Sequence, residues 1–91
     1  MNHLLFFIGT DCPHCTAMIP LVEKLEREMG ITLSVQDIWA DKLAEKLLDG
    51  YRTPDCDGLP YFYNTETGVS LCGEVSYKLL LAWAMGGNVS Q

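Results

Sequence analysis

The sequence predicts an α/β domain in which three helices flank a four-stranded mixed sheet, with the elements in the order βαβαββα. Two observations lead to this prediction. A strand, a helix and a second strand follow one another at the start of the chain, and such a right-handed crossover pairs its strands in parallel. Two later strands are joined by a short, glycine-containing connection, which is typical of an antiparallel hairpin.

The first strand and the first helix are predicted from the spacing of their apolar residues. Residues 4–8 form a short, continuous apolar run closed by Gly9, which is typical of a fully buried strand. From Cys15 onward, apolar residues recur at helical spacing until Gly30 supplies a stop signal. The motif Cys12-Pro13-His14-Cys15 therefore lies where a strand turns into a helix.

The middle of the chain predicts a second strand and a second helix. In residues 31–36 apolar and polar residues alternate, which is typical of a half-buried strand, and we expect this strand to run on through Trp39. Asp41 is expected to cap the second helix at its N-terminus. The apolar face of that helix is expected to consist of Leu43, Leu47, Leu48 and Tyr51.

The last third of the chain predicts the hairpin and a final helix. Residues 60–63 and 69–72 form the two hairpin strands, and residues 64–68 join them. Ser76 is expected to cap the last helix, residues 77–85. This helix is apolar nearly all round, so we expect it to pack against the sheet or against a partner chain.

Length, composition and charge limit the possible functions. A chain of 91 residues with 48% hydrophobic residues has room for one core, so we expect one domain over residues 1–86 and a tail over residues 87–91. The formal charge of −6 argues against nucleic acid or an anionic membrane surface as a partner. No apolar stretch approaches the ~20 residues of a membrane span. The apolar N-terminus is too short for a signal peptide and lacks a basic start, so a cytoplasmic location is expected.

The position of Cys12 and Cys15 predicts redox chemistry. Free N–H groups and the positive end of a helix stabilise a thiolate, and such surroundings lower a cysteine pKa from ~8.5 to roughly 3.5–7.5. Pro13 suits the first helical position, where a missing N–H costs little. Cys12, nearer the tip, is predicted to attack a disulfide, and Cys15 is predicted to resolve the mixed disulfide that results. Zinc knuckles also use a Cys-x-x-Cys motif, so metal-binding or inert thiols remain alternatives.

Three further residues agree with the redox interpretation. Pro20 lies inside the first helix, where proline normally costs ~3 kcal/mol and needs a reason. Pro60 opens a strand, where it does not interrupt the ladder of hydrogen bonds. Gly73 ends the second hairpin strand just before the last helix.

With these residues in place, the chain resembles the thioredoxin superfamily from about residue 3 to residue 85. The size is similar to that of a small, glutaredoxin-like domain. The resemblance implies a thioredoxin-like fold and an oxidoreductase whose redox-active disulfide carries out electron transport. It further implies that Cys12 attacks, that Cys15 resolves and that Pro60 follows a cis peptide bond. Leu59, Pro60 and Gly73 would then bind the substrate.

The resemblance also implies partners but no separate cofactor. The partners would be protein disulfides as substrates and a reductase that recycles the protein. Glutaredoxins usually carry a Gly-Gly-plus-acidic signature after the hairpin, whereas this chain has Cys72-Gly73-Glu74. Glutathione as a cofactor is therefore unsupported, and no metal is expected.

Two polar residues near the motif each have two interpretations. His14 is either a solvent-exposed spacer between the cysteines or an imidazolium that favours the neighbouring thiolate, and we favour the second. Asp37 is either an ordinary polar residue of an edge strand or a carboxylate that helps Cys15 lose its proton, and we favour the first.

The other two cysteines leave several alternatives open. Cys56 and Cys72 should both lie at the end of the sheet that carries Cys12, and Cys72 should lie opposite Tyr61 in the hairpin. We favour two small buried or half-buried thiols without further chemistry. A second redox pair and a four-cysteine metal site remain possible, although the spacing disfavours metal.

Three classes of function therefore remain. The first is a thiol–disulfide oxidoreductase that acts on protein substrates. The second is a binding module whose thiols hold zinc or an iron–sulfur centre. The third is a redox-inactive interaction domain with the same fold.

Overall fold

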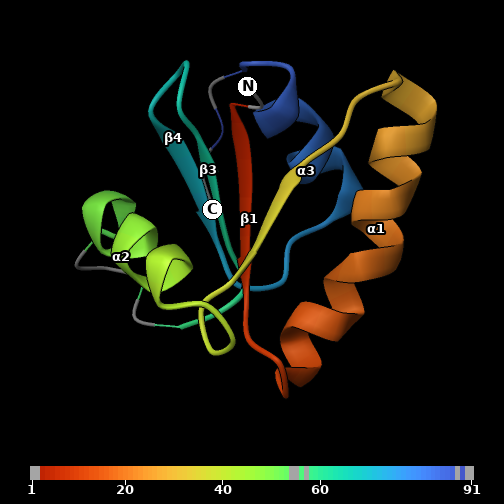
Figure 1. Ribbon diagram of the computed structural model, residues 1–91. Coiled ribbons are helices and arrows are strands. Elements are labelled where there is room, and N and C mark those ends of the chain that lie inside the picture. The colour runs from red at the N-terminus through yellow and green to blue at the C-terminus, as the bar shows by residue number, and fades with distance from the viewer. Residues whose placement is uncertain (1–2, 54–55, 57, 88, 90–91) are drawn as a thin grey trace.

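The structure is a computed structural model that describes residues 3–53, 56, 58–87 and 89 of the chain (Figure 1). The predicted order of elements and the mixed α/β architecture are confirmed. The elements are β1 (Leu4–Ile8), α1 (Pro13–Met29), β2 (Ser34–Asp37), α2 (Lys42–Tyr51), β3 (Tyr61–Asn64), β4 (Val69–Cys72) and α3 (Tyr77–Ala84).

The four strands form one sheet in the order β2-β1-β3-β4. β1 pairs in parallel with β2 and antiparallel with β3, and β3 pairs antiparallel with β4. In this register Phe7 lies opposite Tyr61, and Tyr61 lies opposite Cys72, as the hairpin predicted. The end of β1, the start of β3 and the end of β4 therefore lie at the same end of the sheet. Cys12 follows β1 at this end.

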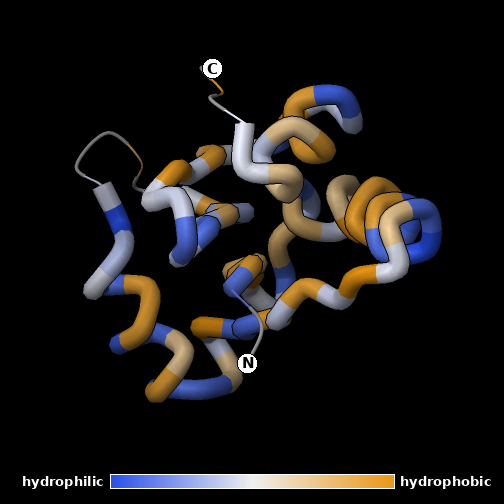
Figure 2. The backbone as a smooth tube through the Cα atoms, turned by 90° about the horizontal axis from the view of Figure 1, so that it is seen from above, coloured by the Kyte–Doolittle hydropathy of each residue, from blue (hydrophilic) through white to orange (hydrophobic). Residues whose placement is uncertain are grey.

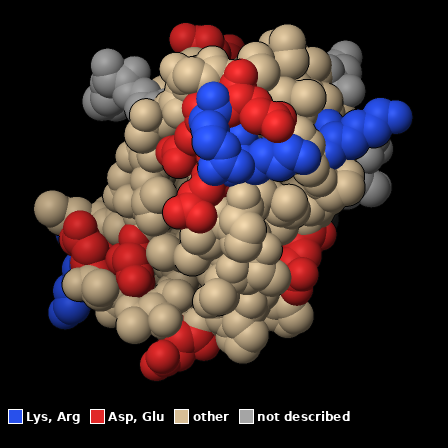
Figure 3. Space-filling model, turned by 90° about the vertical axis from the view of Figure 1, so that its right-hand side faces the viewer, with Lys and Arg blue, Asp and Glu red and all other residues tan. Residues whose placement is uncertain are grey.

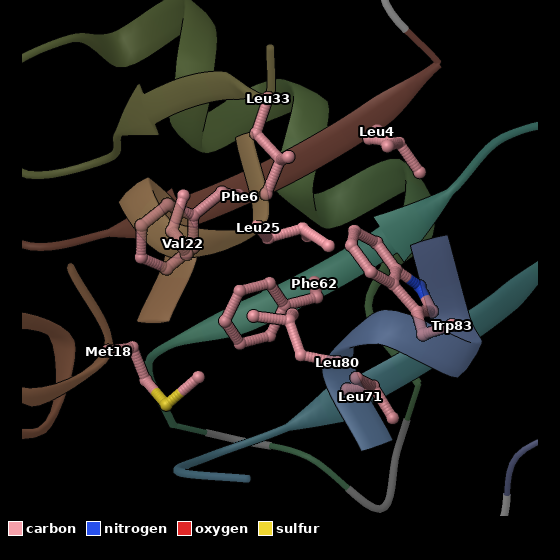
Figure 4. Packing of buried hydrophobic residues seen from close by; sticks show 10 residues of the cluster. All are labelled: Leu4, Phe6, Met18, Val22, Leu25, Leu33, Phe62, Leu71, Leu80 and Trp83. Carbon is pink, nitrogen blue, oxygen red and sulfur yellow. The ribbon is translucent and has the colours of Figure 1, made fainter. Parts of the chain in front are cut away.

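One face of the sheet is covered by α1 and α3 (Figures 1 and 4). Leu4 and Phe6 point into this layer. The Phe6 and Phe62 rings are stacked with centroids 4.7 Å apart, and Trp83 meets Phe62 edge-on at 5.5 Å. Aromatic pairs of this geometry add to the free energy gained by burying their surface. Figure 2 shows α1 nearly end-on, with its hydrophilic residues on the outer side.

The opposite face is covered by α2 (Figure 1). Leu5 and Phe7 point to this side, because side chains alternate between the faces along a strand. Ala44 and Leu48 are the fully buried residues of α2. The prediction that Leu43 and Leu47 belong to the buried face is wrong, since Leu43 is 75% exposed.

The second strand is shorter than predicted. β2 covers four residues, and the chain turns at residues 38–40 instead of extending through Trp39. Leu33 is buried just before the strand, whereas Val35 is 53% exposed because β2 lies at the edge of the sheet. Among the described residues, no helix is long and apolar enough to cross a lipid bilayer.

Candidate active site

Cys12 and Cys15 are joined in a disulfide at the N-terminus of α1, with their Cα atoms 5.2 Å apart. Cys12 is the N-cap of this helix, and Pro13 occupies its first turn as predicted. The backbone N–H of Cys15 donates a hydrogen bond to Cys12 Sγ at 3.2 Å. Both cysteines are buried, while the two residues between them are exposed. The helix therefore presents a backbone donor directly to the sulfur that is predicted to become a thiolate.

The loop that leads into the motif is held by Asp37. Its Oδ2 accepts a hydrogen bond from the Thr10 hydroxyl at 2.9 Å. Its Oδ1 accepts hydrogen bonds from the backbone N–H groups of Trp39 and Ala40 at 3.0 and 3.1 Å. Asp37 thus ties the turn after β2 to the residues before Cys12, which agrees with the structural interpretation of this edge-strand carboxylate.

Trp39 lies beside the same loop, and no sequence pattern indicated a role for it at the site. Its side chain is 57% exposed, and its ring lies against the backbone of Gly9. A Cβ atom at Gly9 would lie 2.6 Å from Trp39 Cδ2, so the ring can approach this closely only over glycine. The sequence signal for this contact is a glycine just before the motif and a tryptophan just after the next strand.

The Leu59–Pro60 peptide bond is cis, which confirms the prediction for Pro60. The backbone carbonyl of Pro60 accepts a hydrogen bond from the N–H of Gly73 at 2.8 Å. Gly73 has φ +81°, in the left-handed region that favours glycine. Leu59 is half-buried and packs against the α2 side of the core. The three residues predicted to bind substrate therefore lie in two adjoining segments, one just before β3 and the other just after β4.

The segment after Gly73 also reaches the motif. His14 Nδ1 and Glu74 Oε2 are in direct contact, and both side chains are partly exposed. Sixty positions separate the two residues in the chain, so sequence patterns did not suggest this pair. The contact joins the first turn of α1 to the loop between β4 and α3.

Cys56 and Cys72 form a second disulfide, with their Cα atoms 5.9 Å apart. The preferred interpretation of two unlinked thiols is therefore wrong, whereas the prediction that both residues lie at the same end of the sheet is confirmed. This disulfide lies on the α2 side of the sheet, where Cys56 is buried and Cys72 packs against the same cluster. Within the described residues, no three His, Cys, Asp or Glu side chains gather closely enough to hold a metal ion.

Apart from the cysteines, the one ionisable side chain on the surface of α1 near the motif is His14. No Lys, Arg, Asp or Glu occurs in α1 before Glu23. Figure 3 shows this side of the molecule, where acidic and basic side chains are interleaved in the upper half and uncharged side chains cover the middle of the lower half. The exposed residues of this uncharged stretch are Pro13, His14, Thr16, Ala17, Ile19 and Pro20.

No model of a known protein family matches the chain, and no curated protein is similar to it.

Proposed function

We propose that the protein is a thiol–disulfide oxidoreductase with a thioredoxin-like fold. The observation that carries the proposal is the Cys12–Cys15 disulfide at the N-terminus of α1, where Cys12 Sγ already accepts a backbone hydrogen bond. A thiolate in the same position would receive the same donor and the positive end of the helix. The cis-Pro60 segment at the same edge of the sheet supports the likeness to the thioredoxin superfamily.

In the proposed reaction the reduced protein attacks a substrate disulfide. The Cys12 thiolate attacks one substrate sulfur, a mixed disulfide forms, and the other substrate sulfur leaves as a thiolate. Cys15 then loses its proton and attacks Cys12 Sγ, which restores the Cys12–Cys15 disulfide and releases the second substrate thiolate. Two electrons pass to the substrate, and a reductase must return them. In the oxidising direction the same steps run in reverse, and the reduction potential of the pair decides which direction prevails.

The substrate class proposed is a disulfide in a protein or peptide. Thr16 and Ile19 belong to the uncharged, exposed stretch of α1, which offers a partner surface without charge repulsion. Pro60 and Gly73 lie at the end of the sheet where Cys12 follows β1, and the hydrogen bond from Gly73 N–H to the Pro60 carbonyl already joins their backbones. A preformed segment of this kind lowers the entropy cost of binding.

The test compares single cysteine variants in the reduction of insulin disulfides. Cys12→Ser should lose the activity, because no sulfur remains to attack. Cys15→Ser should form a stable adduct with the substrate, because only the resolving step is lost. The double variant Cys12→Ser/Cys15→Ser is the control, and it should form no adduct. Full activity in Cys12→Ser would contradict the assignment, and an inactive wild-type protein would favour an interaction domain.

A further inference from the structure

The Cys56–Cys72 disulfide joins the connection between α2 and β3 to the last residue of β4. Cys56 lies four residues before Pro60, and Cys72 directly precedes Gly73. The disulfide and the hydrogen bond between Gly73 N–H and the Pro60 carbonyl therefore link the same two segments of the chain. It connects covalently the two backbone segments that form one wall of the proposed site.

This disulfide has chemical surroundings of its own. It lies among the residues packed under α2, whereas the Cys12–Cys15 disulfide lies at the end of α1, which covers the opposite face of the sheet. Cys56 is only 2% exposed, and Cys72 is half-buried. An incoming thiolate therefore reaches the sulfur of Cys72 more easily than that of Cys56. Cys56 Sγ lies 3.6 Å from the carbonyl oxygen of Gly58, which would accept a hydrogen bond from the thiol after reduction.

We propose that Cys56–Cys72 is a second redox site, reduced by a dithiol, and that it clamps the Pro60 segment in its substrate-binding position. One thiolate of the dithiol attacks Cys72 Sγ, forms a mixed disulfide and expels Cys56 as a thiolate. The second thiol of the dithiol then attacks the mixed disulfide and expels Cys72, while the dithiol leaves as a disulfide. Two electrons pass to the pair, and Cys56 and Cys72 each take up a proton.

This inference rests on the proposed function, in which Cys12 attacks the substrate. The clamp would control how tightly the substrate binds. With the disulfide closed, residues 58–60 are fixed before the substrate arrives. With it open, residues 58–60 must be ordered when the substrate binds. Ordering the backbone of even one residue weakens binding by about tenfold. Reduction of the second site should therefore raise KM and leave kcat nearly unchanged.

The first experiment measures the clamp without measuring activity. The Cys12→Ser/Cys15→Ser protein is treated with dithiothreitol, the new thiols are alkylated, and peptides are analysed by mass spectrometry. Alkylation of both Cys56 and Cys72 is expected. Amide hydrogen exchange should then become faster in the peptide that covers residues 52–60 and stay slow in β1. Unchanged exchange in residues 52–60 would overturn the proposal, as would a loss of protection in β1, which would make the disulfide a general staple of the fold.

The second experiment measures the effect on substrate binding. Cys72→Ser and Cys56→Ala break the same disulfide from opposite sides, and each should raise KM for a disulfide-containing peptide by about tenfold. Ser70→Ala, two residues earlier on β4, is the matched control and should leave KM unchanged. An unaltered KM in both cysteine variants would overturn the proposal. If the wild-type protein lacks exchange activity, the proposed function fails, and the hydrogen-exchange result alone decides the clamp.

Discussion

The contact between His14 and Glu74 lies at the first turn of α1, directly after the predicted nucleophile Cys12. A protonated imidazole next to Cys12 favours its thiolate, whereas the carboxylate of Glu74 opposes the thiolate and offsets the imidazolium. Both side chains are exposed, so solvent and salt screen any charge that they carry. We therefore expect the contact to change the reactivity of Cys12 only modestly, in addition to a larger effect of the helix end.

Glu74→Gln should increase the fraction of Cys12 that is thiolate at neutral pH, because it removes the negative charge and keeps the imidazole. His14→Ala should decrease that fraction. An exposed pair is worth up to about 1 kcal/mol, so each change should stay within about fivefold. The ultraviolet absorbance of the thiolate, followed against pH, measures the effect.

Glu66→Gln is the matched control for this experiment, because Glu66 lies in the hairpin loop at the other end of the sheet. It should leave the titration of Cys12 unchanged. A lower thiolate fraction in Glu74→Gln would show that Glu74 holds the imidazole in place, and that its own charge matters less.

The β3–β4 hairpin is organised by one buried polar residue. Asn64 Nδ2 donates a hydrogen bond to the Trp83 carbonyl at 3.2 Å and so attaches α3 to the sheet. Its Oδ1 accepts hydrogen bonds from the backbone N–H groups of Glu66 and Thr67 at 2.9 and 3.3 Å and so shapes the turn. The hairpin that presents Pro60 and Gly73 is thereby locked to the helix behind it.

Asn64→Ala should lower the free energy of unfolding by about 1–3 kcal/mol, because it leaves a buried carbonyl and two turn amides without their partner. Urea unfolding followed by circular dichroism measures the loss. Glu66→Ala, at an exposed position of the same turn, should change the stability by no more than about 0.5 kcal/mol. Equal losses in both variants would refute the assigned role of Asn64.

The elements were predictable from the sequence because their signals are local. The apolar run before Gly9, the cap at Asp41 and the boundaries of β4 all follow from neighbouring residues. The buried face of α2 was predicted only in part, because Leu48 and Tyr51 lie on it whereas Leu43 and Leu47 do not. Leu43 and Leu47 form one stripe along α2, and Ala44 and Leu48 form the stripe beside it. Hydrophobicity alone predicts that the stripe with two leucines is buried. The structure buries Ala44 under the sheet residues because a small side chain lets the helix approach closely.

Across the whole molecule, the sheet brings together four segments that are far apart in the chain. They are the ends of β1, β2 and β4 and the start of β3, which lie at the same end of the sheet. The crossover predicts the β1–β2 pair and the hairpin predicts the β3–β4 pair, whereas the site roles of Pro60 and Gly73 were predicted from the resemblance to the thioredoxin superfamily. The pairing of Cys56 with Cys72 and the contact of His14 with Glu74 depend on the paths of loops. Those paths are fixed by packing between residues far apart in the chain, and no periodic pattern encodes them.

The two tryptophans of the chain lie in contrasting surroundings. Trp83 is fully buried, with its indole N–H donating to the Val69 carbonyl at 2.9 Å. Trp39 is largely exposed, and its ring lies against Gly9, which precedes Cys12 by three residues. Fluorescence can therefore report two events separately, since a nearby disulfide quenches indole emission and solvent exposure shifts it to longer wavelength.

Opening the Cys12–Cys15 disulfide should change the emission of Trp39, while unfolding should shift the emission of Trp83. Trp39→Phe should abolish the response to reduction and keep the unfolding signal. A full response to reduction in Trp39→Phe would show that the redox state of the motif reaches the core beneath α3. The intrinsic emission of the protein would then report a change in core packing as well as the opening of the Cys12–Cys15 disulfide.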